Sequence, residues 1–166
     1  MKLHSMGIQD GIISDRYGKR GPCNAWGMPT HSLSLTIEEA PEGTRCYAVL
    51  IEDKDAFPIS GGFSWIHWVA ANIEEKVIEE GASQQGRDFV QGVNSWISQQ
   101  GGAHPEEECC FYGGMAPPDA PHIYEIHVFA LDKLLDLKNG FHLNQLFRQM
   151  HGHILDQVTL RGQYAN

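Results

Sequence analysis

Two short stretches of the chain carry residues that could act together on a ligand. In the first stretch, Asp53 and Asp55 precede Trp65 and His67. A carboxylate beside an imidazole accepts a hydrogen bond from a ring N–H, which fixes the tautomer and favours the charged form. Such a ring can donate to an anion, and an indole can form an apolar wall beside it. Because an unpaired imidazole is costly to bury, the stretch indicates a site rather than a core.

The second stretch adds glycine, proline and two more polar rings. Gly113 and Gly114 lie shortly before Pro117, and His122 and Tyr124 follow. Glycine lets the backbone approach a ligand closely, and proline holds a loop in one shape. Exposed backbone N–H groups in such a loop could bind an oxyanion as a nest.

We expect β-strands to position both histidines. Residues 63–73 are rich in aromatic and β-branched residues, and a second strand-like segment follows the glycine-proline loop. Side chains two apart on a strand share a face, so Trp65 points with His67, and His122 points with Tyr124. These rings converge on one site if the two strands are neighbours.

Other segments predict a mainly β protein with a helix late in the chain. Residues 33–37 alternate apolar and polar side chains, as in a strand with one buried face. Residues 46–51 are apolar on both faces, which predicts a central strand. We expect the last strand over residues 123–130. A helix of about three turns is then predicted by apolar residues at helical spacing, namely Leu143, Leu146, Phe147, Met150 and Ile154.

Residues 81–108 are rich in glycine, glutamine and serine and have few apolar positions. This composition predicts a long excursion over the surface. Loops of that length are often functional, so the segment is of interest beside the two histidine stretches.

Size and composition bound the class of protein. A chain of 166 residues is near the usual size of one domain, so we expect a single domain over residues 1–166. The formal net charge of −9 argues against non-specific nucleic-acid binding. No apolar run approaches the ~20 residues that span a bilayer, so we do not expect an integral membrane protein. The four cysteines lack Cys-x-x-Cys spacing and residues 1–7 lack a secretory apolar stretch, which favours a cytoplasmic protein.

The motifs, taken together and in order, resemble the phosphatidylethanolamine-binding protein family, also called Raf-kinase-inhibitor-like proteins, and above all its short bacterial and archaeal branch. The likeness covers about residues 28–166. Asp53-Lys54-Asp55-Ala56-Phe57-Pro58 matches the family's Asp-Pro-Asp-Ala-Pro motif, and Trp65-Ile66-His67-Trp68 matches its Trp-x-His-Trp motif. Tyr112 to Pro118 matches its Tyr-Gly-Gly-Pro-x-Pro-Pro motif, and His122 with Tyr124 matches its His-x-Tyr motif. The closing segments resemble those of the family at Gly152-His153-Ile154-Leu155 and Arg161-Gly162-Gln163-Tyr164.

The resemblance implies a Greek-key sandwich of two antiparallel sheets, to which the helical spacing adds one or two C-terminal helices. It also implies a small pocket that binds phosphate, acetate-like anions or phospholipid head groups. Carried over residue by residue, the pocket consists of Asp53, Asp55, Trp65, His67, Gly113, Gly114, Pro117, His122 and Tyr124. Lys54 stands where the family has proline, and we expect it to add a positive charge at the rim. Residues 94–111 form an unusual rim.

The leading hypothesis is a binding protein without catalytic activity, cofactor or metal. No Gly-x-Ser-x-Gly elbow is present, and neither Cys109 nor Cys110 has an assigned base. The expected partner is a small anion, such as phosphate, a carboxylate or a phospholipid head group. The family name further suggests regulation of a partner kinase or protease, and the family's bacterial members often pair as homodimers.

A metal-dependent enzyme is the alternative. His67, His122 and Asp53 are residue types that suit Zn²⁺ or Fe²⁺, and three protein ligands with an open position would make a catalytic site. No His-x-x-x-His motif supports this interpretation, and His151 and His153 lie in or beside the predicted late helix.

Overall fold

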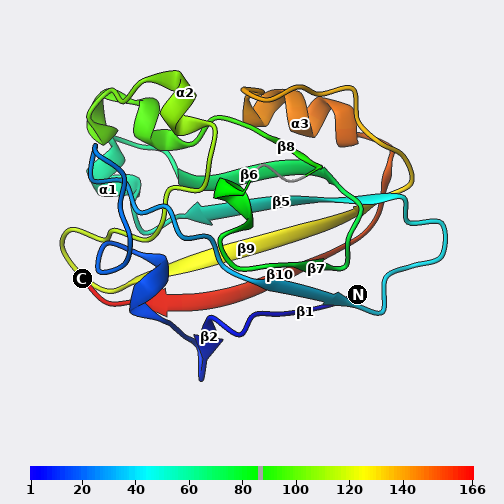
Figure 1. Ribbon diagram of the computed structural model, residues 1–166, viewed down its shortest axis with the longest axis horizontal. Coiled ribbons are helices and arrows are strands. Elements are labelled where there is room, and N and C mark those ends of the chain that lie inside the picture. The colour runs from blue at the N-terminus through cyan, green and yellow to red at the C-terminus, as the bar shows by residue number, and fades with distance from the viewer. Residues whose placement is uncertain (86–87) are drawn as a thin grey trace.

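The computed structural model describes residues 1–85 and 88–166, which form a sandwich of two β-sheets (Figure 1). The large sheet has the order β2 (Ile8–Gln9), β3 (Ile12–Ile13), β10 (Ile154–Tyr164), β9 (His122–Leu131), β5 (Cys46–Asp53), β6 (Trp65–Ile73) and β8 (Val90–Gln91). The small sheet has the order β1 (Lys2–His4), β4 (Leu35–Glu38) and β7 (Val77–Ile78). The predicted mainly β sandwich is confirmed, with a short parallel pairing of β3 with β10 among otherwise antiparallel strands.

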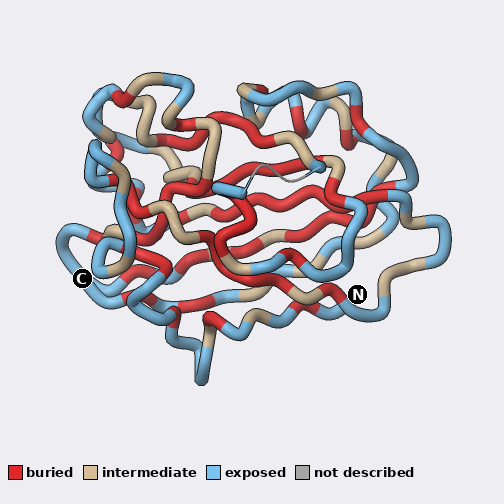
Figure 2. The backbone as a smooth tube through the Cα atoms, in the orientation of Figure 1, coloured by how far each residue is buried: buried red, intermediate tan, exposed pale blue. Residues whose placement is uncertain are grey.

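Strand β5 lies inside the large sheet and is buried on both faces, as its apolar sequence predicts. Tyr47, Val49 and Ile51 pack in the core between the two sheets. The alternate residues, such as Ala48 and Leu50, pack in a second core on the outer face of the large sheet. Burying a large apolar side chain stabilises a fold by about 1.5–3 kcal/mol, so these two layers hold the sheet in place (Figure 2).

Helix α3 (Leu143–Met150) covers the outer core and is shorter than predicted. Leu146 and Met150 are fully buried against the sheet, whereas Phe147 is 46% exposed. His151 already leaves the helical conformation with ψ 120°, Gly152 then adopts φ +80°, and Ile154 begins β10. The predicted stripe is therefore wrong at Ile154, where the chain has already turned back into the sheet.

The expectation that the last strand spans residues 123–130 is also wrong. β10 follows it and pairs with β9 from Ile154 to Tyr164. One face of β10 is exposed and carries Gln157, Thr159 and Arg161, and the half-buried Asp156 interrupts the apolar residues of the other face. That mixture hides the alternation of Val158 and Leu160, which pack against the inner core.

The segment 81–108 is only partly a surface excursion. Its described residues include β8, 3-10 turns at Ala82–Gln84, Ser95–Ile97 and Gln99–Gly101, and the short helix α2 (Glu106–Cys109); residues 86 and 87 lie outside the described residues. Gln91 is buried, and its Oε1 accepts hydrogen bonds from Trp68 Nε1 at 2.7 Å and from Ser83 Oγ at 2.7 Å. Polar composition misled the prediction because these polar groups are paired inside the protein.

A further 3-10 turn spans Asp15–Tyr17, and the short helix α1 (Phe57–Ser60) links β5 to β6. No helix among the described residues is long and apolar enough to cross a membrane. The four cysteines are all free thiols.

Candidate functional site

The two histidine stretches meet at one end of the large sheet, beside α1 and the C-terminus in Figure 1. β6 and β9 are not neighbours, because β5 lies between them. Asp53, the last residue of β5, pairs with Trp65 on one side and with Tyr124 on the other. The end of β5 therefore brings the two stretches together across three strands.

An irregularity in β6 directs His67 inward. Ile51 pairs with Trp68 and Glu52 pairs with Ile66, so His67 is an extra residue opposite β5. A β-bulge of this kind re-aims side chains and lets consecutive residues serve one face. The His67 ring meets the Tyr124 ring with centroids 5.1 Å apart and planes at 73°.

The partners of His67 determine its tautomer. Nδ1 lies 2.6 Å from the Gly113 carbonyl oxygen and 3.0 Å from that of Gly114. Carbonyl oxygens only accept, so Nδ1 carries the proton and donates it. Burial lowers the pKa of His67, so the neutral ring is favoured and Nε2 holds a lone pair. Nε2 is buried and has no hydrogen-bond partner among the described residues.

His122 is in the opposite state. Its Nδ1 donates to Asp53 Oδ2 at 2.7 Å and its Nε2 donates to Asp119 Oδ1 at 2.9 Å. Both nitrogens donate, which describes an imidazolium. Burial works against that charge, but the hydrogen bonds and charges of Asp53 and Asp119 outweigh it and raise the pKa of His122. His122 thus brings a positive charge between two carboxylates.

Tyr124 supplies a hydroxyl without a partner. The side chain is fully buried, and Oη has no hydrogen-bond partner among the described residues. Burial and the nearby charge of Asp53 raise the pKa of Tyr124 well above its usual range and outweigh the nearby Ala116 backbone, which lowers it, so the hydroxyl keeps its proton. An unsatisfied buried polar group costs about 1–3 kcal/mol, so two such groups near each other suggest a place that a ligand or water completes.

Gly113 and Gly114 support the site from behind, and the predicted backbone nest is wrong. Their N–H groups donate to the carbonyl oxygens of His67 and Pro29 at 2.8 and 2.9 Å. A Cβ on Gly113 would lie 2.4 Å from Trp96 Nε1, and one on Gly114 would lie 2.3 Å from a backbone oxygen. The glycines admit neighbouring parts of the protein, and their carbonyls orient His67.

Three other residues lie outside the cavity. Exposed Asp55 accepts a hydrogen bond from Ile123 N at 2.8 Å, which ties the start of β9 to the α1 loop. Pro117 is buried, and its carbonyl accepts from Lys19 Nζ at 2.6 Å. Lys54 contacts Glu52 and Glu125 on the other face of the sheet, so the expected positive charge at the rim is wrong.

The cavity at this site, here called the histidine pocket, has a volume of about 200 Å³. Its lining combines polar groups at the floor with apolar walls, and consists of Asp53, Ala56, Ile59, Trp65, His67, Trp96, Gln100, Gly101, Ala116, Pro118, His122 and Tyr124. Sequence reasoning missed Trp96, whose indole lies 5.8 Å from that of Trp65. The signal that could have found it was the unusual rim at residues 94–111.

A larger groove of about 410 Å³ lies at the other end of β6, beside Ile73. Its polar lining is acidic and includes Glu74, Glu75 and Glu79. No histidine lines it among the described residues, so it shares none of the imidazole groups of the histidine pocket.

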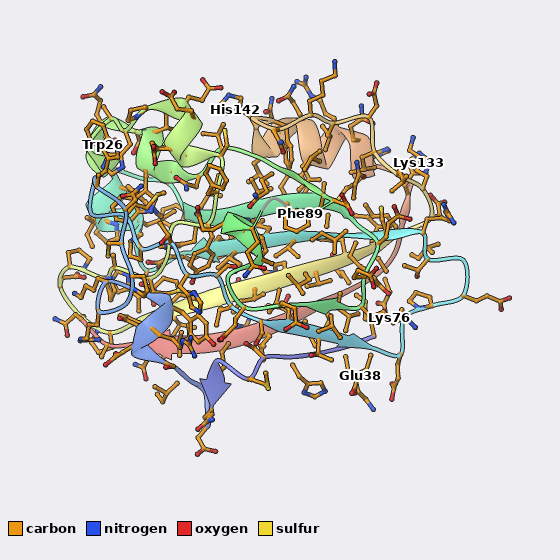
Figure 3. All side chains as sticks on the ribbon, viewed as in Figure 1. Trp26, Glu38, Lys76, Phe89, Lys133 and His142 are labelled. Carbon is orange, nitrogen blue, oxygen red and sulfur yellow. The ribbon has the colours of Figure 1, made fainter. Side chains whose placement is uncertain are left out.

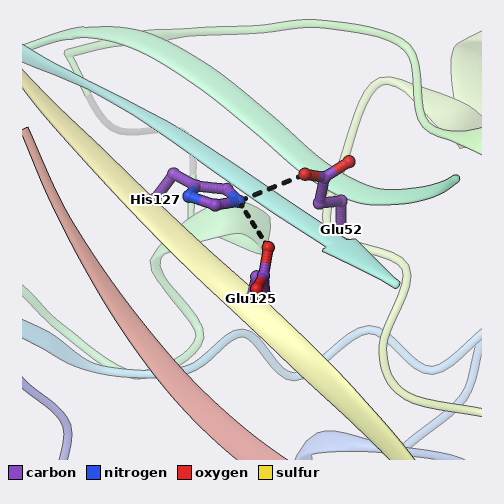
Figure 4. Close-up of side chains that lie close together, drawn as sticks. All are labelled: Glu52, Glu125 and His127. Carbon is purple, nitrogen blue, oxygen red and sulfur yellow. Dashed lines mark hydrogen bonds and ion pairs between the residues drawn. The ribbon is translucent and has the colours of Figure 1, made fainter. Parts of the chain in front are cut away.

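A second polar cluster lies on the outer face of the large sheet. Figure 4 shows His127 between Glu52 and Glu125, and one ligand atom from each lies within 4.8 Å of the others. Lys54 bridges both carboxylates, and Arg161 Nη2 lies 2.8 Å from Glu125 Oε1. The hydrogen bond from His127 is the largest cause that lowers the pKa of Glu52 to about 2. The cationic side chains of Lys54 and Arg161 therefore already balance the charges of Glu52 and Glu125.

The geometry of the histidine pocket offers few free metal ligands. Both nitrogens of His122 and Nδ1 of His67 are engaged in hydrogen bonds. Asp53 accepts from His122 and, at 3.2 Å, from Ala56 N. Only His67 Nε2 is free among these nitrogens, whereas a catalytic Zn²⁺ takes three protein ligands.

Comparisons with known proteins agree with the fold and the motifs. The sequence profile described as phosphatidylethanolamine-binding protein matches residues 5–165. The uncharacterized protein YxkA of Bacillus subtilis is 39% identical over 137 residues, which cover 81% of each chain. The crystal structure of a putative phosphatidylethanolamine-binding protein homolog from Chlamydia trachomatis superposes with a TM-score of 0.80 at 27% identity, covering 99% of this chain and 96% of that one. Escherichia coli YbcL shares the fold, with a TM-score of 0.75 at 21% identity over 99% of this chain and 98% of that one.

Proposed function

Because the chain belongs to the phosphatidylethanolamine-binding protein family, we propose that its histidine pocket binds a small anion together with one proton. The observation that carries the proposal is that His67 Nε2 and Tyr124 Oη are both buried and unpartnered at the pocket; a third such atom, Trp96 Nε1, belongs to its wall. A phosphomonoester or the phosphoryl end of a lipid head group has the chemistry to satisfy both.

One of the two groups needs a hydrogen-bond acceptor on the ligand, and the other needs a donor. Tyr124 Oη–H is a donor and suits a phosphoryl oxygen. His67 Nε2 is an acceptor, because Nδ1 already holds the proton of the neutral ring. A P–OH group can donate to that lone pair, or the ring can take up a proton and donate to a fully ionised anion.

Local charge favours the protonated anion. Asp53 and Asp119 carry two negative charges and His122 carries one positive charge, which leaves one net negative charge around the pocket. A dianion would meet repulsion there. A monoanion that shares its proton with His67 reduces that repulsion, so proton and anion should bind as a pair.

Binding without catalysis is the function this chemistry supports best. Nucleophilic catalysis needs an activated side chain beside a base. The candidate thiols do not meet this need, since burial raises the pKa of Cys109 to about 11 and also raises that of Cys110. The metal-dependent alternative has weaker support, because the hydrogen bonds of His122 and Asp53 would have to break to free a second ligand.

Isothermal titration calorimetry at pH 6 tests the proposal. The ligands are inorganic phosphate, phosphoethanolamine and a short-chain phosphatidylethanolamine below its micelle concentration. We expect native protein to bind phosphoethanolamine and His67→Ala to bind it at least about tenfold more weakly, since a hydrogen bond to a charged group is worth about 1.5–3 kcal/mol. His127→Ala is the matched control, because His127 lies on β9 but on the outer face.

Three outcomes separate the possibilities. Equal affinity of native protein and His67→Ala would contradict the proposal, as would no binding of any of the three ligands. Binding of phosphoethanolamine but not of the short-chain lipid would assign the pocket to free phosphomonoesters.

A further inference from the structure

The walls of the histidine pocket carry information about the ligand beyond its anionic group. Resting on the proposed function, we propose that the preferred ligand bears a planar aromatic ring next to its anionic group. The observation behind it is that two indoles, Trp65 and Trp96, meet at a right angle in the pocket wall.

The two indoles form a corner that fits a flat ring. Their ring centroids lie 5.8 Å apart and their planes make an angle of 88°. Aromatic rings prefer offset-stacked or edge-to-face contacts at centroid distances of about 4.5–7 Å. A planar ring placed in this corner can stack on one indole and present its edge to the other, whereas a saturated ring has no π quadrupole and gains only apolar contact there.

The corner is built before any ligand arrives. Phe63 stacks on Trp65 with centroids 6.0 Å apart and planes at 17°. Trp96 N donates to the Asn94 side chain at 3.0 Å, and Ile66 N donates to Ser95 Oγ at 2.9 Å, which fixes the loop against β6. A preorganised wall loses little conformational entropy on binding.

A continuous row of rings supports Trp96 from behind. His104 lies 5.7 Å from Trp96, and Trp26 lies 5.7 Å from His104. Trp26 is 55% exposed beside α1 and α2 (Figure 3). The buried His104 ring thus packs against the Trp96 indole and limits its movement.

The pocket has room for such a ligand. An engineered cavity of about 150 Å³ holds benzene. The histidine pocket measures about 200 Å³, which leaves space for one anionic substituent beside a six-membered ring. Ile59 and Pro118 add apolar lining, and the unpartnered His67 Nε2 and Tyr124 Oη can hydrogen-bond to the anionic substituent.

Phenyl phosphate and cyclohexyl phosphate provide the test, with methyl phosphate as the reference ligand without a ring. All three carry the same phosphoryl group, and the two larger ones differ in planarity and in π electrons. Calorimetry at pH 6 should show phenyl phosphate binding about tenfold more tightly than cyclohexyl phosphate. Trp65→Leu should reduce that ratio to about threefold or less, whereas Trp65→Phe should keep most of it.

Phe147→Leu is the control, because Phe147 is an exposed aromatic residue on α3 outside the pocket. Equal affinities of phenyl and cyclohexyl phosphate, with methyl phosphate still bound, would overturn the aromatic preference and leave anion binding intact. A ratio unchanged in Trp65→Leu would overturn the assignment to this corner. No binding of any phosphate monoester would contradict the proposed function itself.

Discussion

His67 and His122 lie in the same pocket and hold opposite protonation states. His67 faces two backbone carbonyls and a buried surface, so it is neutral and presents a lone pair. His122 faces two carboxylates, so it is charged and fully engaged. This difference divides their roles: His122 with Asp53 forms a fixed ion pair, and His67 keeps the one free ring nitrogen for the ligand.

The protonation state of His67 predicts how binding depends on pH. Burial lowers the pKa of His67, so the free protein has a neutral ring near pH 7, and a phosphomonoester loses its second proton near pH 6. Above about pH 6.5 the complex therefore holds one more proton than its separated parts, and the association constant should fall about tenfold per pH unit. Below about pH 6 the ligand brings the proton and affinity should level off.

Calorimetry of phosphoethanolamine between pH 5.5 and pH 8 measures this, and two buffers of different ionisation enthalpy count the protons. We expect uptake of about one proton at pH 7.5 and little at pH 5.5. Affinity independent of pH across the range would show that the anion binds without His67.

A substitution of Lys54 tests whether its charge acts at the pocket or on the outer face of the large sheet. It follows Asp53 in sequence, yet it pairs with Glu52 and Glu125 on the outer face. Lys54→Ala should therefore change phosphoethanolamine affinity by less than about twofold. The same variant should raise the pKa of Glu52 from about 2, because the ammonium is one of the groups that lowers it. A large loss of affinity in Lys54→Ala would place its charge at the pocket after all.

At the scale of elements, the site depends on one bulge, one strand end and one loop. The motifs predicted that Trp65, His67, His122 and Tyr124 would share a site, and the structure brings them together. The bulge at His67 could not be predicted, since it depends on how β6 registers with β5. Trp96 was missed for a similar reason: its loop has no periodic pattern, and its position is set by Gly113, which is close in space and distant in sequence.

Gly113 tests the packing of that loop. Gly113→Ala would place a Cβ 2.4 Å from Trp96 Nε1, so the indole must move. We expect a loss of about 1–3 kcal/mol in the free energy of unfolding, measured by urea denaturation, and a loss of the phenyl phosphate preference. In a Trp96→Ala background the same change should cost clearly less, as a double-mutant cycle would reveal. Equal costs in both backgrounds would mean that Trp96 is not what requires the glycine.

Helix α3 tests the outer core. Leu146 is fully buried there, so Leu146→Ala should lower the free energy of unfolding by about 2–5 kcal/mol. Phe147→Ala, next in the chain but 46% exposed, should cost less than about 1.5 kcal/mol. Chemical denaturation of both variants compares them directly, and similar losses would contradict the placement of the helix.

At the scale of the whole molecule, the pocket lies at the end of the large sheet where β5 ends and β6 and β9 begin. Residues 46–51 predicted a central strand, and β5 is central because both its faces are apolar. β10 escaped prediction because its exposed face carries mixed polar residues, although it pairs along the whole of β9. The two cores hold the large sheet in place. The pairing of its strands in turn sets the positions of Asp53, Trp65 and His122, which lie at strand ends. Of the residues that the motifs predicted, Asp53, Trp65, His67, His122 and Tyr124 line the pocket, whereas Asp55, Gly113, Gly114 and Pro117 do not.

The ring nitrogens of His67 offer the most direct test of proton-linked anion binding. In ¹⁵N-labelled protein at pH 7, phosphoethanolamine should shift His67 Nε2 from the resonance of a lone-pair nitrogen toward that of a protonated one. Nδ1 should change little, because it keeps its bonds to the Gly113 and Gly114 carbonyls. Saturation of the protein with ligand while His67 Nε2 stays at its free position would contradict the account.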